Sequence, residues 1–323
     1  MCEFITGGGL NAVSLPKSLV NEGSLMRDAL LADLAALDYF EIITTHDARL
    51  LPVIDSSTAI SAKSDCWLIW QQLIEQADLV WLIAPESDNI LLKLTMLCKQ
   101  YDKVIIGCNE AQVIATTGSK YATYKALQSA NILTIPTYRV DDHQELYNDT
   151  TSSFIVKPDD GVGCEGVRHC DSQQELQEQL ATHNKKWVVQ PFQRGNPASI
   201  AMLCKDGKAW LLSCNQQIVR RTQGKLSLKG VIINAMVNHW LALDQLAQKI
   251  ATAIPDLRGF IGVDVIIDDT NIYVVEINPR LTTSYAGLSL AMNSNTAKLV
   301  LDCLLKENFV MPIITKNKVE ILL

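Results

Sequence analysis

Short apolar runs alternate with stretches of helical apolar spacing over the first third of the chain. Helical spacing is found at residues 25–37 and 89–100. The apolar runs predict buried strands at residues 40–44, 79–84 and 104–107. Strands and helices that alternate in this way are typical of a parallel sheet with helices on both faces, so we expect an N-terminal α/β domain.

The pattern changes after Asn109, where strands no longer alternate regularly with helices. Residues 119–130 predict a helix that Thr117 or Ser119 would cap. Further strands are expected at residues 153–156, 187–190, 199–204 and 209–214, and further helices at residues 172–182, 240–254 and 296–306. We therefore expect an α+β region after the α/β domain.

The composition is that of an acidic globular protein. The 323 residues carry a formal net charge of −7, and 48% of them are hydrophobic. A nucleic-acid-binding protein usually shows a basic surplus or stripe, which this sequence lacks, so we expect no nucleic-acid partner. The chain does not begin with a basic segment before an apolar run, and its apolar runs are too short to span a bilayer. We expect a cytoplasmic protein with no membrane partner.

The nine cysteines indicate structural thiols rather than a metal site. No pair has Cys-x-x-Cys spacing, and no histidine cluster accompanies them. A catalytic cysteine needs a partnered base, which the sequence does not indicate. We expect reduced, mostly buried side chains.

Lysines and glycines form the first candidate site. Lys120 lies just inside a predicted helix, and Lys157 ends a predicted strand. A lysine in such a position can reach phosphate oxygens as a point charge. The turn that follows contains Gly161, Gly163 and Gly166, and glycines let backbone N–H groups approach a polyphosphate closely. A solvated lysine and an ordinary turn are the alternatives for each element alone.

The strand that ends at Gln190 and Pro191 forms a second candidate element, together with Gln193. A strand that leads into a short hinge can present backbone C=O and N–H groups to an adenine edge, and proline keeps its carbonyl group. An ordinary strand and turn is the alternative interpretation of this segment on its own.

Carboxylates within apolar strands form the third element. The runs 262–267 and 272–277 predict a hairpin in which Asp264, Glu276 and Asn278 converge on one face. Isolated carboxylates are rarely buried unless they are paired or bound to metal. Oxygen ligands of this kind suit Mg²⁺ bound together with ATP phosphates. A carboxylate that faces solvent explains one of these acids, but not both of them followed by Asn-Pro-Arg.

In this order, the elements resemble the ATP-grasp superfamily over roughly residues 110–310. The resemblance implies a parallel α/β pre-ATP-grasp domain followed by a two-lobed ATP-grasp domain that clamps ATP. The expected bounds are residues 1–109 for the first domain, 110–189 for the small lobe with a glycine-rich lid, and 190–323 for the C-terminal lobe with the metal site.

The resemblance also implies a role for each candidate residue that binds the nucleotide. Lys120 and Lys157 would bind the ATP phosphates. The segment Gly161 to Gly166 would be the mobile lid. Adenine would be recognised by Gln190, the Pro191 carbonyl group and the Gln193 amide.

The third element would, by the same resemblance, bind metal and substrate. Asp264, Glu276 and Asn278 would hold two Mg²⁺ ions, or Mn²⁺ in their place. Arg280 would hold the transferring phosphate or the substrate carboxylate, which makes it the expected catalytic residue. The implied enzyme is an ATP-dependent, ADP-forming ligase that joins a carboxylate to an amine.

Segments at both ends of the chain resemble one ATP-grasp subgroup, which includes the tyramine–glutamate ligase of methanofuran biosynthesis and bacterial relatives in one-carbon metabolism. These segments are residues 2–9, 212–217 and 278–285. The subgroup implies glutamate and a tyramine-like or tyrosine-like amine as small-molecule substrates, joined through an acyl phosphate, and a homodimer is compatible with the sequence. The alternatives are another amino-acid or peptide ligase, a small-molecule kinase, and a non-catalytic nucleotide-binding scaffold.

Some positions depart from the pattern of the superfamily. Gln190 stands where an acid is common, and Pro197 stands where many relatives have the glutamate that binds ribose. Asn196 or Gln193 would have to replace that glutamate. A basic cluster is expected either to add a phosphate contact or to be a solvated loop; it consists of Arg220, Arg221, Lys225 and Lys229.

Two further segments have open roles. The glycines at positions 7–9 form either a ligand loop or a plain turn. Ser284 and Tyr285 either touch the substrate or pack in the interior.

Overall fold

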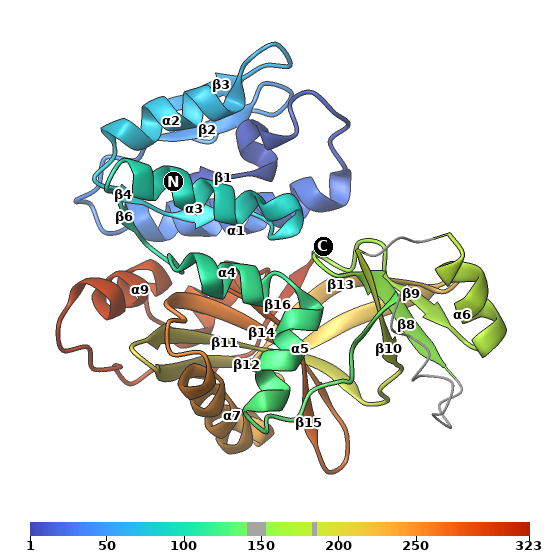
Figure 1. Cartoon of the computed structure of the whole chain (residues 1–323). Coiled ribbons are helices and arrows are strands. Elements are labelled where there is room, and N and C mark those ends of the chain that lie inside the picture. Colours follow the sequence, from blue (N-terminus) through green and yellow to red (C-terminus); the bar gives the residue numbers. More distant parts are fainter. Residues whose placement is uncertain (141–152, 183–185) are drawn as a thin grey trace.

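The computed structural model describes residues 1–140, 153–182 and 186–323. The N-terminal part is an α/β domain of parallel strand pairs and helices, drawn in blue and cyan in Figure 1. Its strands pair as β1 with β5, β2 with β3, and β4 with β6, and every pair is parallel. Its elements are β1 (Cys2–Glu3), η1 (Ile5–Gly9), α1 (Lys17–Ala35), β2 (Thr44–Asp47), β3 (Ser57–Ile60), α2 (Cys66–Gln76), β4 (Leu79–Val80), β5 (Leu82–Ile83), η2 (Ser87–Asn89), α3 (Ile90–Gln100) and β6 (Val104–Ile105).

The strand predicted at residues 40–44 was placed too early, because the buried strand β2 is polar. Side chains of this strand form hydrogen bonds in the interior. Thr45 Oγ1 donates to the Gly7 carbonyl at 2.7 Å and accepts from Trp70 Nε1 at 3.1 Å. The single strand predicted at residues 79–84 is two strands, because β4 pairs with β6 and β5 pairs with β1.

The rest of the chain is built on one ten-stranded sheet with the order β15-β14-β11-β12-β13-β9-β8-β10-β7, in which β16 also pairs with β13. All its strand pairs are antiparallel. Its strands are β7 (Tyr138–Arg139), β8 (Phe154–Pro158), β9 (Arg168–Cys170), β10 (Trp187–Pro191), β11 (Asn196–Lys205), β12 (Lys208–Thr222), β13 (Lys225–Ile233), β14 (Gly259–Ile267), β15 (Ile272–Asn278) and β16 (Val319–Leu322).

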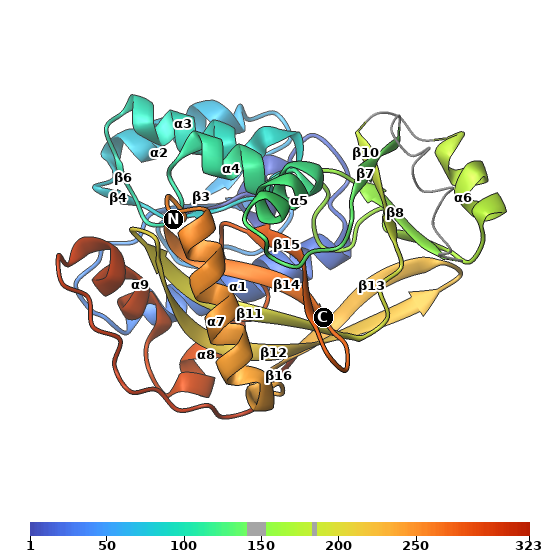
Figure 2. The same cartoon turned by 60° about the horizontal axis from the view of Figure 1, so that its bottom comes forward.

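Helices cover this sheet and complete the expected α/β and α+β architecture. Figure 2 shows α7 lying across β11 and β12, while α6 lies at the far end of the sheet against β8. The helices are α4 (Ala111–Thr117), α5 (Lys120–Ser129), α6 (Gln173–Leu180), η4 (Val237–His239), α7 (Trp240–Ala253), α8 (Tyr285–Met292) and α9 (Thr296–Leu305).

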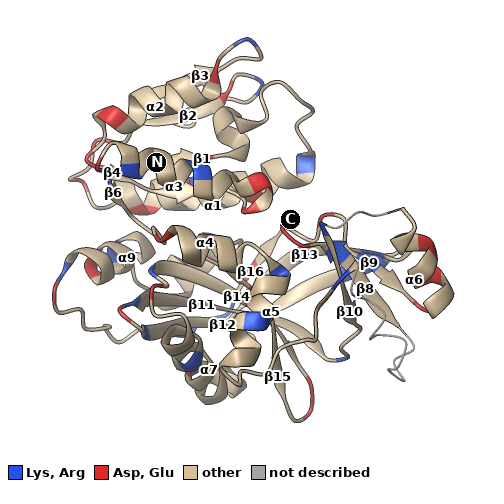
Figure 3. Ribbon diagram, viewed as in Figure 1, with Lys and Arg blue, Asp and Glu red and all other residues tan. Residues whose placement is uncertain are grey.

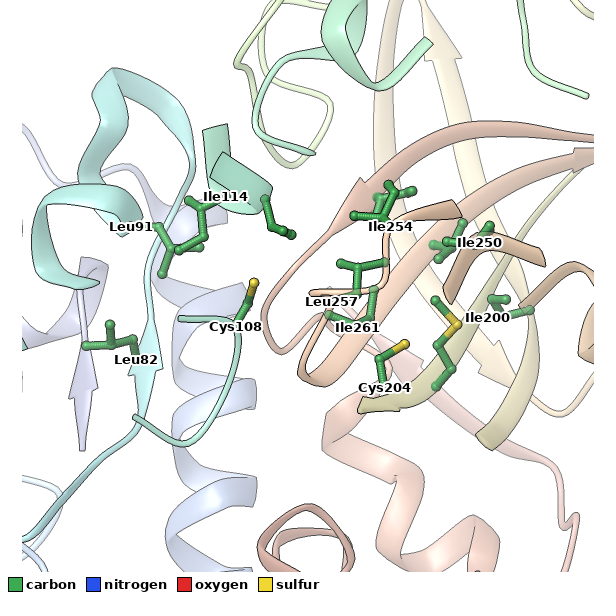
Figure 4. Close-up of a cluster of buried hydrophobic side chains, with 14 of the residues drawn as sticks. Leu82, Leu91, Cys108, Ile114, Ile200, Cys204, Ile250, Ile254, Leu257 and Ile261 are labelled. Carbon is green, nitrogen blue, oxygen red and sulfur yellow. The ribbon is translucent and has the colours of Figure 1, made fainter. Parts of the chain in front are cut away.

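One hydrophobic core joins the α/β domain to the large sheet. Figure 4 shows Cys108 between Leu91 of α3 and Leu257, which precedes β14. The backbones also meet here: a Cβ at Gly259 would lie 2.7 Å from the Gly107 Cα atom. Because these residues are buried together, the α/β domain is a fixed wall of whatever site lies beside it.

Asp33 of α1 ties the α/β domain to α8 and α9. Its carboxylate accepts hydrogen bonds from Tyr285 Oη at 2.8 Å and from Ser289 Oγ at 2.7 Å. Tyr285 is fully buried and packs edge-on against Phe260. Burial and the neighbouring Asp33 raise the pKa of Tyr285 well above its usual value. Tyr285 therefore has a packing role.

Replacing Tyr285 by phenylalanine is expected to destabilise the fold without changing substrate KM. The change removes one buried hydrogen bond to a carboxylate, which is worth about 1–3 kcal/mol. Urea denaturation should show a lower midpoint with an unchanged slope. Tyr39→Phe, on an exposed side chain, is the matched control. Unchanged stability with an altered KM would instead show contact with substrate.

Candidate active site

A cavity of about 590 Å³ lies where the β14–β15 hairpin, the strands β8 and β10, and helix α1 meet. It brings together every predicted site residue except Gly166. These residues are Lys120, Lys157, Gly161, Gly163, Gln190, Pro191, Gln193, Asp264, Glu276, Asn278 and Arg280. The predicted elements are therefore parts of one site, although they are spread over most of the chain.

The β14–β15 hairpin places oxygen ligands on one face. Asp264 lies directly opposite Glu276, and Asn278 follows two residues later on the same strand. Gln217 Nε2 donates to Asp264 Oδ1 at 2.8 Å. Burial and the adjacent charge of Glu276 raise the pKa of Asp264 well above its usual value. The two carboxylates are therefore close enough to repel each other strongly.

Two lysines supply the opposite charge. Lys120 Nζ lies 3.5 Å from Glu276 Oε2 and donates to the Gly161 carbonyl at 2.6 Å. Burial lowers the pKa of Lys157 to about 8, although the charge of Glu276 opposes this effect. Burial also acts to raise the pKa of Glu276, but Lys120 and Lys157 outweigh it and hold that pKa below its usual value.

This donor set fits a hard divalent cation that is shared with a polyphosphate. Mg²⁺ commonly binds through one or two carboxylates and completes its shell with phosphate oxygens and water. Asp264, Glu276 and Asn278 offer two carboxylates and one amide oxygen. Within residues 1–140, 153–182 and 186–323, no group of three or more His, Cys, Asp or Glu residues is arranged to hold a metal ion.

The glycine-rich turn after β8 is anchored to the start of α5. Ser119, the cap of that helix, donates Oγ to Asp159 Oδ2 at 2.6 Å, so the position of Lys120 depends on the turn. Gly163 lines the cavity and has a backbone φ of +61°, a conformation that residues with a side chain rarely adopt. Gly166 is not among the lining residues; its φ of +72° shapes the turn against Trp187.

The hinge after β10 forms the opposite end of the cavity. The side chain of Gln190 is buried and donates Nε2 to Thr137 Oγ1 at 2.8 Å, so its amide nitrogen fixes the neighbouring loop. Pro197 lines the cavity, whereas exposed Asn196 does not. Phe192 meets His169 edge-on with centroids 4.4 Å apart. Apolar side chains complete this end, among them Ile155, Leu228 and Ile266.

Two acids of the α/β domain were missed by sequence reasoning. Glu86 is buried and binds Arg280 Nε at 3.0 and 3.1 Å. Glu22 of α1 lines the cavity and accepts from Thr283 Oγ1 at 2.7 Å. Burial acts to lower the pKa of Arg280, but Glu86 and Glu22 raise it overall. Neither acid lies in a motif, so the sequence offers no signal for them.

The cysteines are free and none is fully exposed. Cys164 lies in the glycine-rich turn and lines the cavity, but burial and the charges of Glu276 and Asp264 raise its pKa to about 12. A thiol with such a pKa is a poor nucleophile at neutral pH.

The structure also locates the segments whose roles the sequence left undecided. The glycines at positions 7–9 form the η1 turn outside the residues that line the cavity. Arg221 pairs with Asp171, and both line the cavity, while Figure 3 shows further basic residues near β8 and β9. Ser284 lines the cavity as well.

Comparisons with known proteins identify the family of the chain. The ATP-grasp domain family matches residues 117–284, and the pre ATP-grasp 3 domain family matches residues 40–113. The chain therefore belongs to the ATP-grasp family.

Two curated relatives are tyramine–L-glutamate ligases. The one from Methanocaldococcus jannaschii is 26% identical over 88% of this chain and 83% of its own length. The one from Methanocaldococcus fervens is 28% identical over 66% of this chain and 62% of its own length. A solved ATP-grasp superfamily protein from Archaeoglobus fulgidus has the same fold, with a TM-score of 0.72 and 20% identity over 99% of this chain and 98% of its own.

The family and its curated relatives confirm the predicted class, an ATP-dependent ligase that joins a carboxylate to an amine. Across the described residues, no helix has both the length and the apolar character needed to cross a membrane.

Proposed function

We propose that the protein forms an amide bond between glutamate and tyramine, or a tyrosine-like amine, through an acyl-phosphate intermediate. The observation that supports the ATP-driven step is the meeting of Asp264 and Glu276 with Lys120 and Lys157 in one cavity. The curated relatives support glutamate and tyramine as the substrates. On that basis the product belongs to the biosynthesis of a methanofuran-type cofactor.

The chain's own residues account for the first half of this reaction. A carboxylate oxygen of glutamate attacks the γ-phosphorus of ATP, and the bond from that phosphorus to ADP breaks. Lys120 and Lys157 stabilise the charge on the phosphoryl oxygens, and Arg280 binds the carboxylate or the phosphoryl group in transfer. Asp264, Glu276 and Asn278 would hold Mg²⁺, which supplies further charge neutralisation when it is bound.

The second half needs no nucleophilic side chain. The ammonium group of the amine first loses one proton to solvent, and the free amine nitrogen attacks the acyl carbon. The bond to phosphate then breaks, and the phosphate accepts the second proton from the nitrogen as the amide forms. The protein contributes the relative position of the reactants. In this proposal the segment Gly161 to Gly166 closes over the intermediate and excludes water, because hydrolysis would consume ATP without product.

The nucleotide would lie along the cavity, between the carboxylates and lysines at one end and the hinge after β10 at the other. Adenine fits the apolar end, with the backbone of Gln190 and Pro191 and the amide of Gln193 as its polar contacts. The proposal also retains the domain bounds 1–109, 110–189 and 190–323, so that ATP lies between the two later lobes.

The test is ADP release from Mg²⁺-ATP and glutamate, measured with and without tyramine or tyrosine, together with the mass of the product. Release that requires both partners, and a product of the summed mass less water, supports the ligase. Release with glutamate alone that yields a stable phosphorylated product indicates a kinase. Tight ATP binding without turnover on any pair rules out the proposed substrates.

A further inference from the structure

Among the described residues, the cavity-lining acids Glu22 and Glu165 make no ion pair, and they differ because Glu22 is half-buried whereas Glu165 is exposed. Arg280, whose pKa the charge of Glu22 helps to raise, is hydrogen-bonded to Glu86 instead. Asp264 and Glu276 face the two lysines, and Asp171 pairs with Arg221. The Glu22 carboxylate accepts a hydrogen bond from the neutral hydroxyl of Thr283. A carboxylate held inside a substrate cavity in this way is suited to a cationic ligand.

The surroundings of Glu22 offer further acceptors rather than further charge. Thr282, Thr283 and Ser284 line the same end of the cavity, and the hydroxyls of Thr282 and Ser284 lie 3.1 Å apart. An ammonium group has three N–H donors and no acceptor, so a carboxylate beside hydroxyl oxygens matches it. Helix α1 is packed against α8 through Asp33, which fixes the backbone that carries Glu22.

Glu22 also lies at the reacting end of the cavity. A Cβ at Gly163 would be 3.1 Å from Glu22 Oε2, so the carboxylate touches the glycine-rich turn. Its charge acts on Arg280 and on Cys164, which in turn is close to Glu276 and Asp264. The guanidinium group and the Glu22 carboxylate therefore lie on neighbouring walls, an arrangement that fits a substrate with an anionic and a cationic group.

We propose that Glu22 forms a subsite that binds the ammonium group of a substrate. This inference rests on the proposed ligase function and specifies the substrate class of the same site. Two sources have the required chemistry: the amino group of the amine substrate, and the α-amino group of glutamate. The binding energy comes from a charge-assisted hydrogen bond, so removal of the charge is expected to weaken binding about 10- to 100-fold.

The experiment compares Glu22→Gln with wild type in three reactions that contain Mg²⁺-ATP. The first joins glutamate to tyramine. The second traps the acyl phosphate of glutamate with hydroxylamine, which is uncharged at neutral pH, and the third does the same with glutarate, which lacks the amino group. Glu41→Gln, an exposed residue of the same domain outside the cavity lining, is the matched control.

A higher tyramine KM with unchanged hydroxamate formation from glutamate assigns the subsite to the amine. A higher glutamate KM in the hydroxamate reaction, with glutarate unaffected, assigns it to the α-amino group. Thr283→Val should give a smaller change of the same kind, because the Glu22 carboxylate remains and only its neutral hydrogen-bond partner is lost. Equal losses with glutamate and glutarate, or no change in any reaction, overturn the inference.

Calorimetry separates this inference from the proposed function. Binding of tyramine is compared with binding of 4-ethylphenol, and glutamate with glutarate, in the full-length protein. Glu22→Gln should weaken the cationic member of one pair about 10- to 100-fold and leave its neutral analogue unchanged. If wild type catalyses none of the reactions, the proposed function fails, while this difference in binding still decides the role of Glu22. Equal effects on both members of each pair exclude an ammonium subsite.

Discussion

Replacing Glu276 by glutamine is expected to abolish ATP-dependent ligation while the protein still folds. Glu276 is opposite Asp264 and faces both lysines, so its charge is required at the point where phosphate, cation and lysines meet. Loss of one such electrostatic contact lowers kcat by roughly 10²–10³, and loss of a metal ligand adds to this. ADP release over a range of Mg²⁺ concentrations measures the effect.

Thermal unfolding provides a second readout for Glu276→Gln. Mg²⁺-ATP at about 100 times its dissociation constant stabilises a protein by about 2.7 kcal/mol, so wild type should show a clear rise in Tm. The variant should lose most of that rise and keep the circular dichroism of the wild type. Asp269→Asn, in the exposed turn of the same hairpin, should behave as wild type. Full activity of Glu276→Gln would exclude Glu276 from the metal site.

The residues within motifs could be predicted because their chemistry is local. A carboxylate in an otherwise apolar strand, or a lysine at the end of a buried strand before a glycine-rich turn, breaks the hydrophobic pattern of its own segment. Such a break can be seen in the sequence. Lys157, Asp264 and Glu276 are examples, and all three line the cavity. The helix cap at Ser119 was visible for the same reason.

Glu22 and Glu86 could not be predicted, because nothing in their own segments is unusual. Glu22 lies in helix α1, where an acid is ordinary, and its partner Thr283 is 261 residues away. Glu86 pairs with Arg280 across 194 residues. Such contacts depend on how the α/β domain packs against the large sheet, which local periodicity does not encode. The polar strand β2 was misplaced for a related reason, since tertiary hydrogen bonds rather than apolar burial stabilise it.

Replacing Lys157 by methionine is expected to weaken ATP binding and turnover together. The side chain is 4% exposed, and burial lowers its pKa to about 8, so it lies at the desolvated end of the cavity beside Glu276. A desolvated charge contributes more to phosphate binding than one in water. We expect the ATP dissociation constant to rise about 10- to 100-fold and kcat to fall by a further factor of roughly 10–100. Calorimetry and ADP release measure the two effects.

Methionine keeps the length and the apolar stem of Lys157, so the comparison isolates the charge. Lys63→Met, on an exposed side chain of the α/β domain, controls for the loss of one positive charge from the protein. An unchanged ATP affinity with reduced kcat would mean that Lys157 acts only on the phosphoryl group in transfer. An unchanged affinity and an unchanged kcat would remove it from the site. Because the charges of Lys157 and Glu276 act on each other, the effects of the two substitutions should not be additive. A double variant that loses as much as the sum of the single losses would show that the two residues act independently.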